Sequence, residues 1–455
     1  MINNGLVRFA QADIGIYGGA ISGTGSLEKT GAGTTILTAS NTYSGMTTIT
    51  TGALQLGNGG TTGSIVGAVN NNGTLAFNRS DAITFPGVIS GSGSVNQIGT
   101  GATILTANNT YTGLTTVAAG RLQLGNGGTT GSIVGAVNNN GTLAFNRSDV
   151  VTYGGVVSGT GSLAQAGSGT LILSADHNYT GGTAISAGTL QIGNGGTKGS
   201  VLGNIANNAA LTFNRSDDVT YGGVISGTGS LTQAGSGQLT LTGSNTFTGG
   251  TTVNAGLLTV NGSLASGVNV LGGGRLGGTG TIGGNVSVSG TISPGNSIGT
   301  INIVGNYVQN PGSTYQVELN ASGQSDLISV TGNATINGGT VVAQAGSVAR
   351  NATYTIVKAT GSVASAYTGL SSNFAFLIPS LSYDPHNVYL TFRTAFAGGA
   401  QSGNQKAVGA ALDQVSPLAT GDLDTVVNPW PTSTRSKACR RWRRSAAIRM
   451  PTSAP

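Results

Sequence analysis

Apolar and polar residues alternate along short segments of this chain. The alternation is clearest in the tripeptides Leu54–Leu56, Leu75–Phe77 and Ile83–Phe85. A period of two is typical of a β-strand with one buried face. Gly, Asn and Ser separate the segments, as turn residues do. The pattern therefore predicts many short strands, and no helical spacing accompanies it in this region.

The same pattern returns with a 68-residue period. The sequence GTGSL at Gly23–Leu27 reappears as GSGSV at Gly91–Val95, and as GTGSL at Gly159–Leu163 and Gly227–Leu231. A fixed period without insertions predicts that the copies pack on one another in one repeating geometry. Two further motifs repeat in the same way: LQLGNGG or LQIGNGG at 54–60, 122–128 and 190–196, and FNRSD at 77–81, 145–149 and 213–217.

Apolar residues that recur at this period predict buried columns. Short strands are not stable alone, but stacked coils bury an inner face and pair every backbone group with a neighbouring coil. We therefore predict an all-β fold, a right-handed parallel β-helix (solenoid), with about three coils of about 23 residues in each repeat. The asparagine runs 70–72 and 138–140 predict turn ladders of stacked amides. The predicted columns are Leu37, Leu105, Leu173 and Leu241; Leu54, Leu122, Leu190 and Leu258; and Phe77, Phe145 and Phe213.

The sequence GTGSLEKTGAGTTILTASNTYSGMTTITTGALQLGN, residues 23–58, resembles the autotransporter-associated β-strand repeat of bacterial passenger domains. Matching copies start at Gly91, Gly159 and Gly227. Residues 272–345 are similar to the C-terminal part of such passengers, and the segments 354–361 and 381–392 continue that similarity. NQKAVGAALD at 404–413 resembles the helical linker that follows. The resemblance implies a type V secretion passenger, displayed on the cell surface or outer membrane or released outside the cell.

The resemblance also implies a domain organisation. Residues 1–262 are expected to be a β-helix of 68-residue repeats with a partial first copy. Residues 263–393 are expected to form a distinct C-terminal capping region, similar to an autochaperone, and this region is expected to nucleate folding. Residues 394–428 resemble a linker to a translocator barrel, which is the partner in intact relatives and is missing here. Met1 aligns inside a repeat with no signal peptide before it, so we expect that this chain alone does not reach the surface.

Net charge separates the last segment from the rest. Residues 435–455 hold 7 of the 19 basic residues, whereas residues 1–434 carry 12 basic and 13 acidic residues. We interpret residues 429–455 as an aberrant, frameshifted and disordered tail. A nucleic-acid or membrane arm is the weaker interpretation of these charges.

The candidate chemistry is sparse. Ser297 lies in a G-x-S-x-G match at 295–299, but that nucleophile motif needs a strand-to-helix turn, and β-pattern surrounds this one. The G-x-G-x-x-G matches at 272–277 and 278–283 run into further β-pattern, whereas a dinucleotide site needs a helix there. One Cys and two distant histidines, His177 and His386, offer no zinc spacing. We therefore expect no catalytic, cofactor-binding or metal-binding residues.

Two repeated features carry further expectations. The sequence Arg-Ser-Asp recurs at 79–81, 147–149 and 215–217, and predicts a solvated turn ladder. Tyr43, Tyr111, Tyr179 and Phe247 recur at the same period, which favours an aromatic stack inside or along the solenoid over a sugar-binding aromatic ladder.

These observations lead to one functional hypothesis. The chain is expected to be a structural or adhesive passenger without enzymatic activity, which mediates adhesion or self-association. Its expected partners are host or bacterial surface molecules or a second copy, bound weakly and multivalently, and not nucleic acid. The alternative is the stalk of an enzyme-bearing autotransporter whose protease or lipase domain lies upstream of Met1.

Overall fold

The computed structural model describes residues 1–345, 348, 352–374, 376–400 and 402–415. The predicted tail at 429–455 lies outside the described residues. The described chain divides into two compact units. The first unit is Met1–Gln238 with Gly243–Gly249, and the second is Leu239–Thr242 with the described residues from Gly250 onward.

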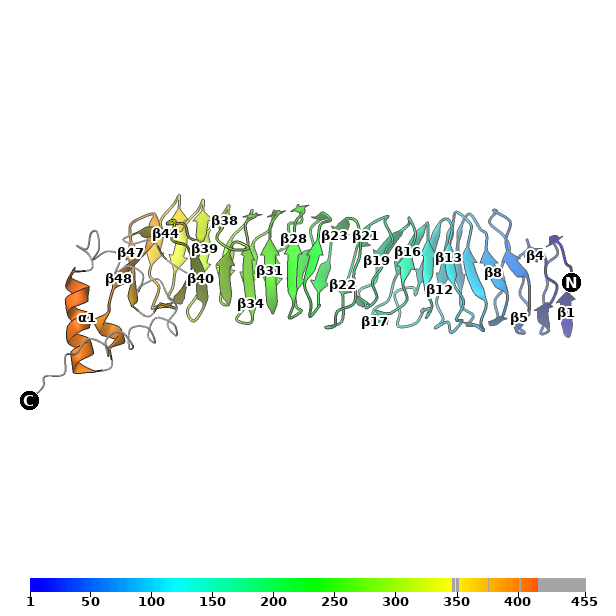
Figure 1. The fold of residues 1–455 in the computed structure, drawn as a ribbon. Coiled ribbons are helices and arrows are strands. Elements are labelled where there is room, and N and C mark those ends of the chain that lie inside the picture. The colour runs from blue at the N-terminus through cyan, green and yellow to red at the C-terminus, as the bar shows by residue number, and fades with distance from the viewer. Residues whose placement is uncertain (346–347, 349–351, 375, 401, 416–455) are drawn as a thin grey trace, which may run out of the picture. The chain divides into compact units, whose positions relative to one another are not determined.

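The first unit consists of parallel strands stacked coil on coil, as Figure 1 shows for the blue to green part of the chain. One sheet has the order β1 (Leu6–Phe9), β3 (Ser26–Lys29), β5 (Thr47–Ile49), β7 (Val69–Asn71) and β10 (Ile89–Ser90). A second sheet has the order β2 (Gly15–Tyr17), β4 (Thr34–Leu37), β6 (Ala53–Leu56), β8 (Thr74–Phe77), β11 (Ser94–Gln97), β13 (Thr115–Val117), β15 (Val137–Asn139) and β18 (Val157–Ser158).

A third sheet has the order β9 (Ala82–Phe85), β12 (Ala102–Leu105), β14 (Arg121–Leu124), β16 (Thr142–Phe145), β19 (Ser162–Gln165), β21 (Thr183–Ile185), β23 (Ile205–Asn207) and β26 (Ile225–Ser226). A fourth series pairs in the order β17 (Val150–Tyr153), β20 (Thr170–Leu173), β22 (Thr189–Ile192), β24 (Ala210–Phe213) and β27 (Ser230–Gln233). Three further short strands are β25 (Val219–Tyr221), which precedes β26 in the chain, β28 (Gln238–Leu241), which lies mostly in the second unit, and β29 (Ser244–Asn245). The predicted parallel β-helix is thus confirmed.

Strand register gives the length of a coil. Ala82 pairs with Ala102, Ala102 with Arg121, and Arg121 with Thr142, so each of these coils advances the chain by 19 to 21 positions. The coil from Thr115 to Val137 advances it by 22. The 68-residue repeat therefore fills three coils and about one third of the next. The prediction of three 23-residue coils is wrong, because the sequence period is not a whole number of coils.

Because each repeat exceeds three whole coils by about one third, equivalent strands of successive repeats lie in different sheets. The equivalent strands β9 and β17 lie in different sheets, and β25 lies in a third. One coil, formed by β18, β19 and β20, contributes a strand to each of three sheets, so these sheets are the three faces of the coil. Successive repeats thus present the same residues on successive faces.

The interior matches the predicted inward positions but not the predicted columns. Leu37, Leu105, Leu173 and Leu241 are all fully buried. They do not stack on one another, because Leu105 lies in register between Phe85 and Leu124 on neighbouring coils. Each stack instead contains different positions of the repeat. On one face the order is Leu37, Leu56, Phe77, Gln97, Val117 and Asn139, and on the next it is Leu105, Leu124, Phe145, Gln165, Ile185 and Asn207.

Buried amides form hydrogen bonds both within a coil and between neighbouring coils. The Gln97 Nε2 donates to the carbonyls of Gly99 and Gly101, and its Oε1 accepts from Thr103 at 2.6 Å. Asn71 is also buried, and its Nδ2 donates to the carbonyl of Ser94 at 2.8 Å on the following coil. The asparagine amides therefore bond to the main chain of the next coil. The predicted stacking of amides on amides is wrong, since the next coil carries different residues.

The second unit also has parallel strands in three series, green to orange in Figure 1. One series is β30 (Thr251–Val253), β33 (Val268–Val270), β36 (Val286–Val288), β39 (Tyr307–Gln309), β42 (Ala334–Ile336) and β45 (Val363–Ser365). The second is β31 (Gly256–Val260), β34 (Gly274–Gly278), β37 (Thr291–Pro294), β40 (Thr314–Leu319), β43 (Thr340–Ala345) and β46 (Gly369–Ser372). The third is β32 (Ser263–Leu264), β35 (Thr281–Ile282), β38 (Thr300–Ile303), β41 (Leu327–Val330), β44 (Thr353–Ala359), β48 (Asn387–Thr394) and β47 (Leu377–Tyr383).

The coils of the second unit lengthen toward its end. Thr251 pairs with Val268 near its start, whereas Ala334 pairs with the more distant Val363 near its end. Antiparallel pairing of β48 with both β44 and β47 then closes the third series. The 3₁₀ helix η1 (Ala397–Gly399) and the helix α1 (Gly403–Val415) follow, and α1 covers the segment that resembles a helical linker. No helix among the described residues combines the length and apolar character needed to cross a bilayer.

Candidate functional site

Each repeat of the first unit carries one exposed loop, at 57–63, 125–131 and 193–199. The loops follow β6, β14 and β22 and end before serines that form bridges to the preceding coil. Residues 58–62 of the first loop are all exposed. Gly63 has φ +99°, and a Cβ there would lie 2.2 Å from the nitrogen of Gly57. The loop therefore closes tightly on its own first residue, which requires glycine at that position.

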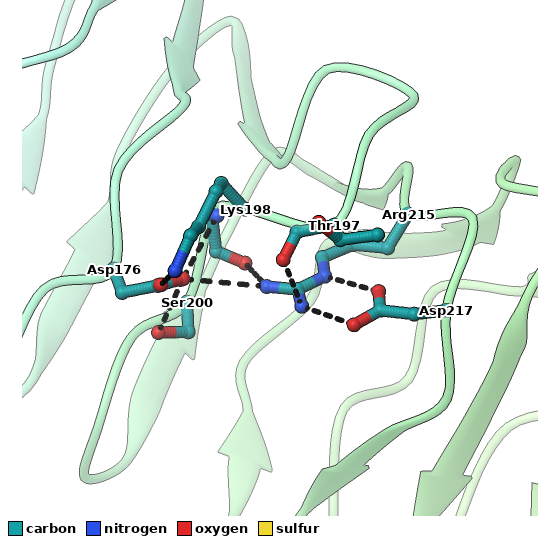
Figure 2. Close-up of polar contacts among 7 residues, drawn as sticks. Asp176, Thr197, Lys198, Ser200, Arg215 and Asp217 are labelled. Carbon is teal, nitrogen blue, oxygen red and sulfur yellow. Dashed lines mark hydrogen bonds and ion pairs between the residues drawn. The ribbon is translucent and has the colours of Figure 1, made fainter.

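One arginine side chain donates hydrogen bonds to main-chain carbonyls of each loop, as Figure 2 shows for the third copy. The Arg215 guanidinium pairs with Asp217 through two hydrogen bonds, of 2.8 and 2.7 Å. It also donates to the carbonyls of Thr197 and Gly199, each at 2.7 Å. The Arg215 side chain is only 12% exposed. A flat guanidinium with five donors suits this set of carboxylate and carbonyl acceptors.

The same contacts recur in the other copies. Arg79 pairs with Asp81 and donates to the carbonyls of Thr61 and Gly63. Arg147 pairs with Asp149 in the same way and donates to the carbonyls of Thr129 and Gly131. The prediction of a solvated turn ladder is therefore wrong for the arginines, whose side chains are largely buried. These arginines also do not form a ladder, since they lie on successive faces.

Charge is balanced locally within each Arg-Ser-Asp clamp, defined as residues 79–81, 147–149 or 215–217 with their loop contacts. The hydrogen bonds from Arg79 lower the pKa of the Asp81 carboxyl, and Arg147 and Arg215 lower the pKa of Asp149 and Asp217 in the same way. Each carboxylate therefore stays ionised at neutral pH and holds its guanidinium in place. A paired, ionised aspartate is unsuited to general acid catalysis.

The third copy carries additional charges. Asp176 stands where the second copy has Asn108, and its carboxylate accepts from Lys198 Nζ at 2.7 Å. It also accepts from the Gly199 N–H at 3.1 Å, as the Asn108 side chain does from Gly131. Lys198 is 73% exposed. The loop geometry is thus the same in these copies, while its outer charge differs.

The three loops point from three different faces. They follow strands of the second sheet, the third sheet and the fourth series, which are the three faces of one coil. Gly60, Gly128 and Gly196 in these loops would meet no atom within 4 Å of an added Cβ and have no positive φ. The first unit therefore displays three exposed loops, each bonded to an arginine, on three different faces.

The family described as passenger-associated-transport-repeat matches residues 27–56, 95–124, 163–192 and 231–260. The first three matches end at the strands that precede the clamped loops. The four matched segments identify the repeats of this chain as those of autotransporter passenger domains. The loops and their Arg-Ser-Asp clamps lie outside the matched segments of the passenger.

The passenger is also similar to a protein named Adhesin BmaC autotransporter, from Brucella suis biovar 1 (strain 1330). The two are 39% identical over 177 residues, which cover 33% of this chain and 5% of the relative. The aligned part of the passenger thus spans about one twentieth of the relative's length.

The weaker candidate sites of the passenger have structural explanations. Ser297 is exposed in the turn that joins β37 to β38, so no helix follows it as a nucleophile elbow requires. The two G-x-G-x-x-G matches lie in and around β34 and β35, again without a following helix. His386 lies in the turn between β47 and β48, and its Nδ1 contacts the carbonyl of Gly361. Among the described residues, no group of His, Cys, Asp and Glu has a metal-binding arrangement.

The recurring aromatic residues belong to the interior. Tyr43, Tyr111, Tyr179 and Phe247 are fully buried, which excludes a surface sugar ladder. The Tyr111 hydroxyl is 2.6 Å from the Thr115 hydroxyl, and burial raises the pKa of Tyr43 to about 12.

Sequence reasoning overlooked a set of corner residues, Asn41, Asn109, His177 and Asn245, which share the 68-residue period and are all buried. The period itself was the signal that could have found them.

Proposed function

We propose that this passenger is displayed on the bacterial surface and mediates adhesion or self-association through many weak contacts, without catalysis of its own. The name of its relative, an adhesin, supports this proposal. The observation that carries it is the repeated display of one arginine-bonded, exposed loop on three faces of the first unit. Weak contacts at several sites gain strength through effective concentration, and preformed loops lose little entropy on binding.

The loops fit this role better than the strands between them. Their exposed residues are Asn, Gly and Thr, with Lys198 in the third copy. The main-chain nitrogens of Gly60, Thr61 and Thr62 have no hydrogen-bond partner within the part of the chain that the structure describes. Free N–H groups and small side chains permit close approach by a partner surface. The proposed partners are host or bacterial surface molecules or a second copy of the passenger.

Adhesion of beads coated with the full chain tests the proposal. Gly60→Glu, Gly128→Glu and Gly196→Glu each add a bulky side chain in open space, so the fold is retained. We expect a small loss of binding to epithelial monolayers, or of bead clumping, from each single change. The triple variant is expected to lose at least about tenfold, because multivalent binding multiplies such losses.

The matched control places the same charge on strands. Thr84→Glu, Thr152→Glu and Thr220→Glu change exposed positions that share the 68-residue spacing of the loops. An equal loss from this triple control would refute the role of the loops. Beads that neither adhere nor clump above albumin-coated beads would refute the adhesive function itself. Turnover of a protease or esterase substrate by the pure chain would contradict the non-catalytic role.

A further inference from the structure

Among the four buried corner residues of the first unit, Asn41, Asn109, His177 and Asn245, only His177 is not an asparagine. At three of the four positions an asparagine side chain bonds to neighbouring main chain. The Asn109 Oδ1 accepts from the Ile89 N–H at 2.9 Å, and its Nδ2 donates to the carbonyls of Ala107 at 2.9 Å and Ser132 at 3.0 Å. Asn41 makes the equivalent three bonds. The amide therefore supplies one acceptor and two donors at this corner.

His177 replaces the amide in the third repeat and makes fewer bonds. Its Nδ1 accepts from the Val157 N–H at 3.0 Å, in the place of the Asn109 Oδ1. Its Nε2 is buried and has no hydrogen-bond partner among the described residues. The residue is 2% exposed, and Tyr153 stacks on the ring at 6.4 Å. Since Nδ1 is an acceptor, the single proton of the neutral ring sits on Nε2.

A charged ring does not fit this corner. An imidazolium carries a proton on both nitrogens, so its Nδ1–H would point at the Val157 N–H. Burial lowers the pKa of His177 more than the neighbouring Asp176 carboxylate raises it, and that carboxylate binds Lys198, Arg215 and the Gly199 N–H. The other titratable groups packed against the ring are the hydroxyls of Tyr153 and Tyr179, which are neutral below pH 10 because burial raises their pKa values.

We propose that His177 makes the third repeat an acid-sensitive element, which opens at its corner and releases the 193–199 loop while the first two repeats stay closed. The corner and the loop are linked directly. The His177 N–H donates to the carbonyl of Ser200 at 3.0 Å, and Asp176 holds the Gly199 N–H. Loss of the Nδ1 contact therefore disturbs these two attachments of the loop to the preceding coil.

The direction of the pH effect follows from linkage. Burial lowers the pKa of His177 to about 4, whereas the same ring in an opened corner has a pKa of 6.5. The open state binds the extra proton, so opening becomes more favourable as the pH falls below 6.5. Between pH 7.5 and 4.5 the opening equilibrium is expected to rise about 70-fold. Hydrogen bonds from Lys198 lower the pKa of Asp176, which therefore remains ionised over this range.

Hydrogen exchange of the full chain at pH 7.5 and 4.5, corrected for intrinsic exchange rates, tests the proposal. We expect the protection factors of the amides in residues 153–200 to be about 70-fold lower at pH 4.5 than at pH 7.5, while those of residues 85–132 stay unchanged. His177→Asn restores the corner chemistry of the other repeats and should abolish the acid response. Asn109→His is the matched transfer variant and should confer the response on residues 85–132.

Several outcomes would overturn the proposal. An equal acid response in the first two repeats would show that His177 is not its source, and so would an unchanged response in His177→Asn. A ring that titrates near pH 6.5 by NMR in the folded chain would also contradict it. If Asn109→His does not fold at neutral pH, the comparison of wild type with His177→Asn decides alone.

Discussion

Replacing Leu105 with alanine gives a sensitive test of the coil register. Leu105 is fully buried on β12, between Phe85 and Leu124 on the neighbouring coils. Hydrogen bonding fixes coil spacing at about 4.8 Å, so the neighbours cannot collapse into the space left behind. Loss of transfer energy and the remaining cavity together should cost about 3–4 kcal/mol.

The adjacent Ile104 is the matched control, because it has the same volume on the same strand but faces outward. It is half-buried, and it lies in register between Thr84 and Gln123. We expect Ile104→Ala to cost less than about 1 kcal/mol. Urea unfolding of both variants, followed by hydrogen exchange within residues 85–124, measures the difference. Equal costs for Ile104→Ala and Leu105→Ala would refute the register, since a slip of one residue exchanges inward and outward faces.

Three further predictions concern polar groups. Arg147→Gln should cost about 1–3 kcal/mol and raise hydrogen exchange in the 125–131 loop, because two loop carbonyls lose their donor; unchanged exchange there would contradict the clamp. Burial raises the pKa of Asp326 to about 7, so the folded state binds the proton more tightly than the unfolded state. Unfolding titrations should therefore show that the stability of the second unit falls as the pH rises from 4 to 7, and Asp326→Asn should remove that slope. A slope that persists in Asp326→Asn would show that another group causes the pH dependence. Tyr111→Phe should lower the unfolding free energy by about 1 kcal/mol through the lost contact with Thr115, and a neutral result would show that the hydroxyl is dispensable.

Alternation in the sequence was sufficient to predict which side chains face inward. Leu54, Leu75 and Phe77 alternate with their neighbours along the strand, and all three are fully buried. The parallel β-helix follows from the same pattern, because short strands of this kind are stabilised by stacking. Family resemblance added the passenger assignment, which the repeat match and the adhesin relative support.

Coil length could not be predicted from the 68-residue period, because coils within one repeat have different sequences. Leu37, Leu56 and Phe77 share a stack without sharing a motif. A weaker signal was present in a column of glycines at coil spacing. A Cβ on Gly45 would lie 2.4 Å from the carbonyl oxygen of Gly25, and one on Gly87 would lie 2.3 Å from that of Gly67. Such close contacts require glycine once per coil.

The clamped loops were partly visible in the sequence. The Arg-Ser-Asp spacing pointed to local pairing, which the structure contains, but the arginine's contacts with loop carbonyls depend on tertiary packing. Thr61 lies well before Arg79 in the chain and meets it through the stacking of coils. Burial of Arg79 was therefore beyond the reach of a local pattern. The exception at His177 was visible as a departure from three asparagines, although its missing bonds required the structure.

Distances between the loops measure the repeat geometry most directly. Spin labels on pairs drawn from Thr61→Cys, Thr129→Cys and Thr197→Cys, in a Cys439→Ser background, report these distances by pulsed electron paramagnetic resonance. Successive loops on different faces should be about 25 Å apart, from about 16 Å along the coil stack and about 20 Å across one face. Distances of about 15 Å for both successive pairs would place the loops on one face, as three whole coils per repeat require, and would contradict the three-sided display.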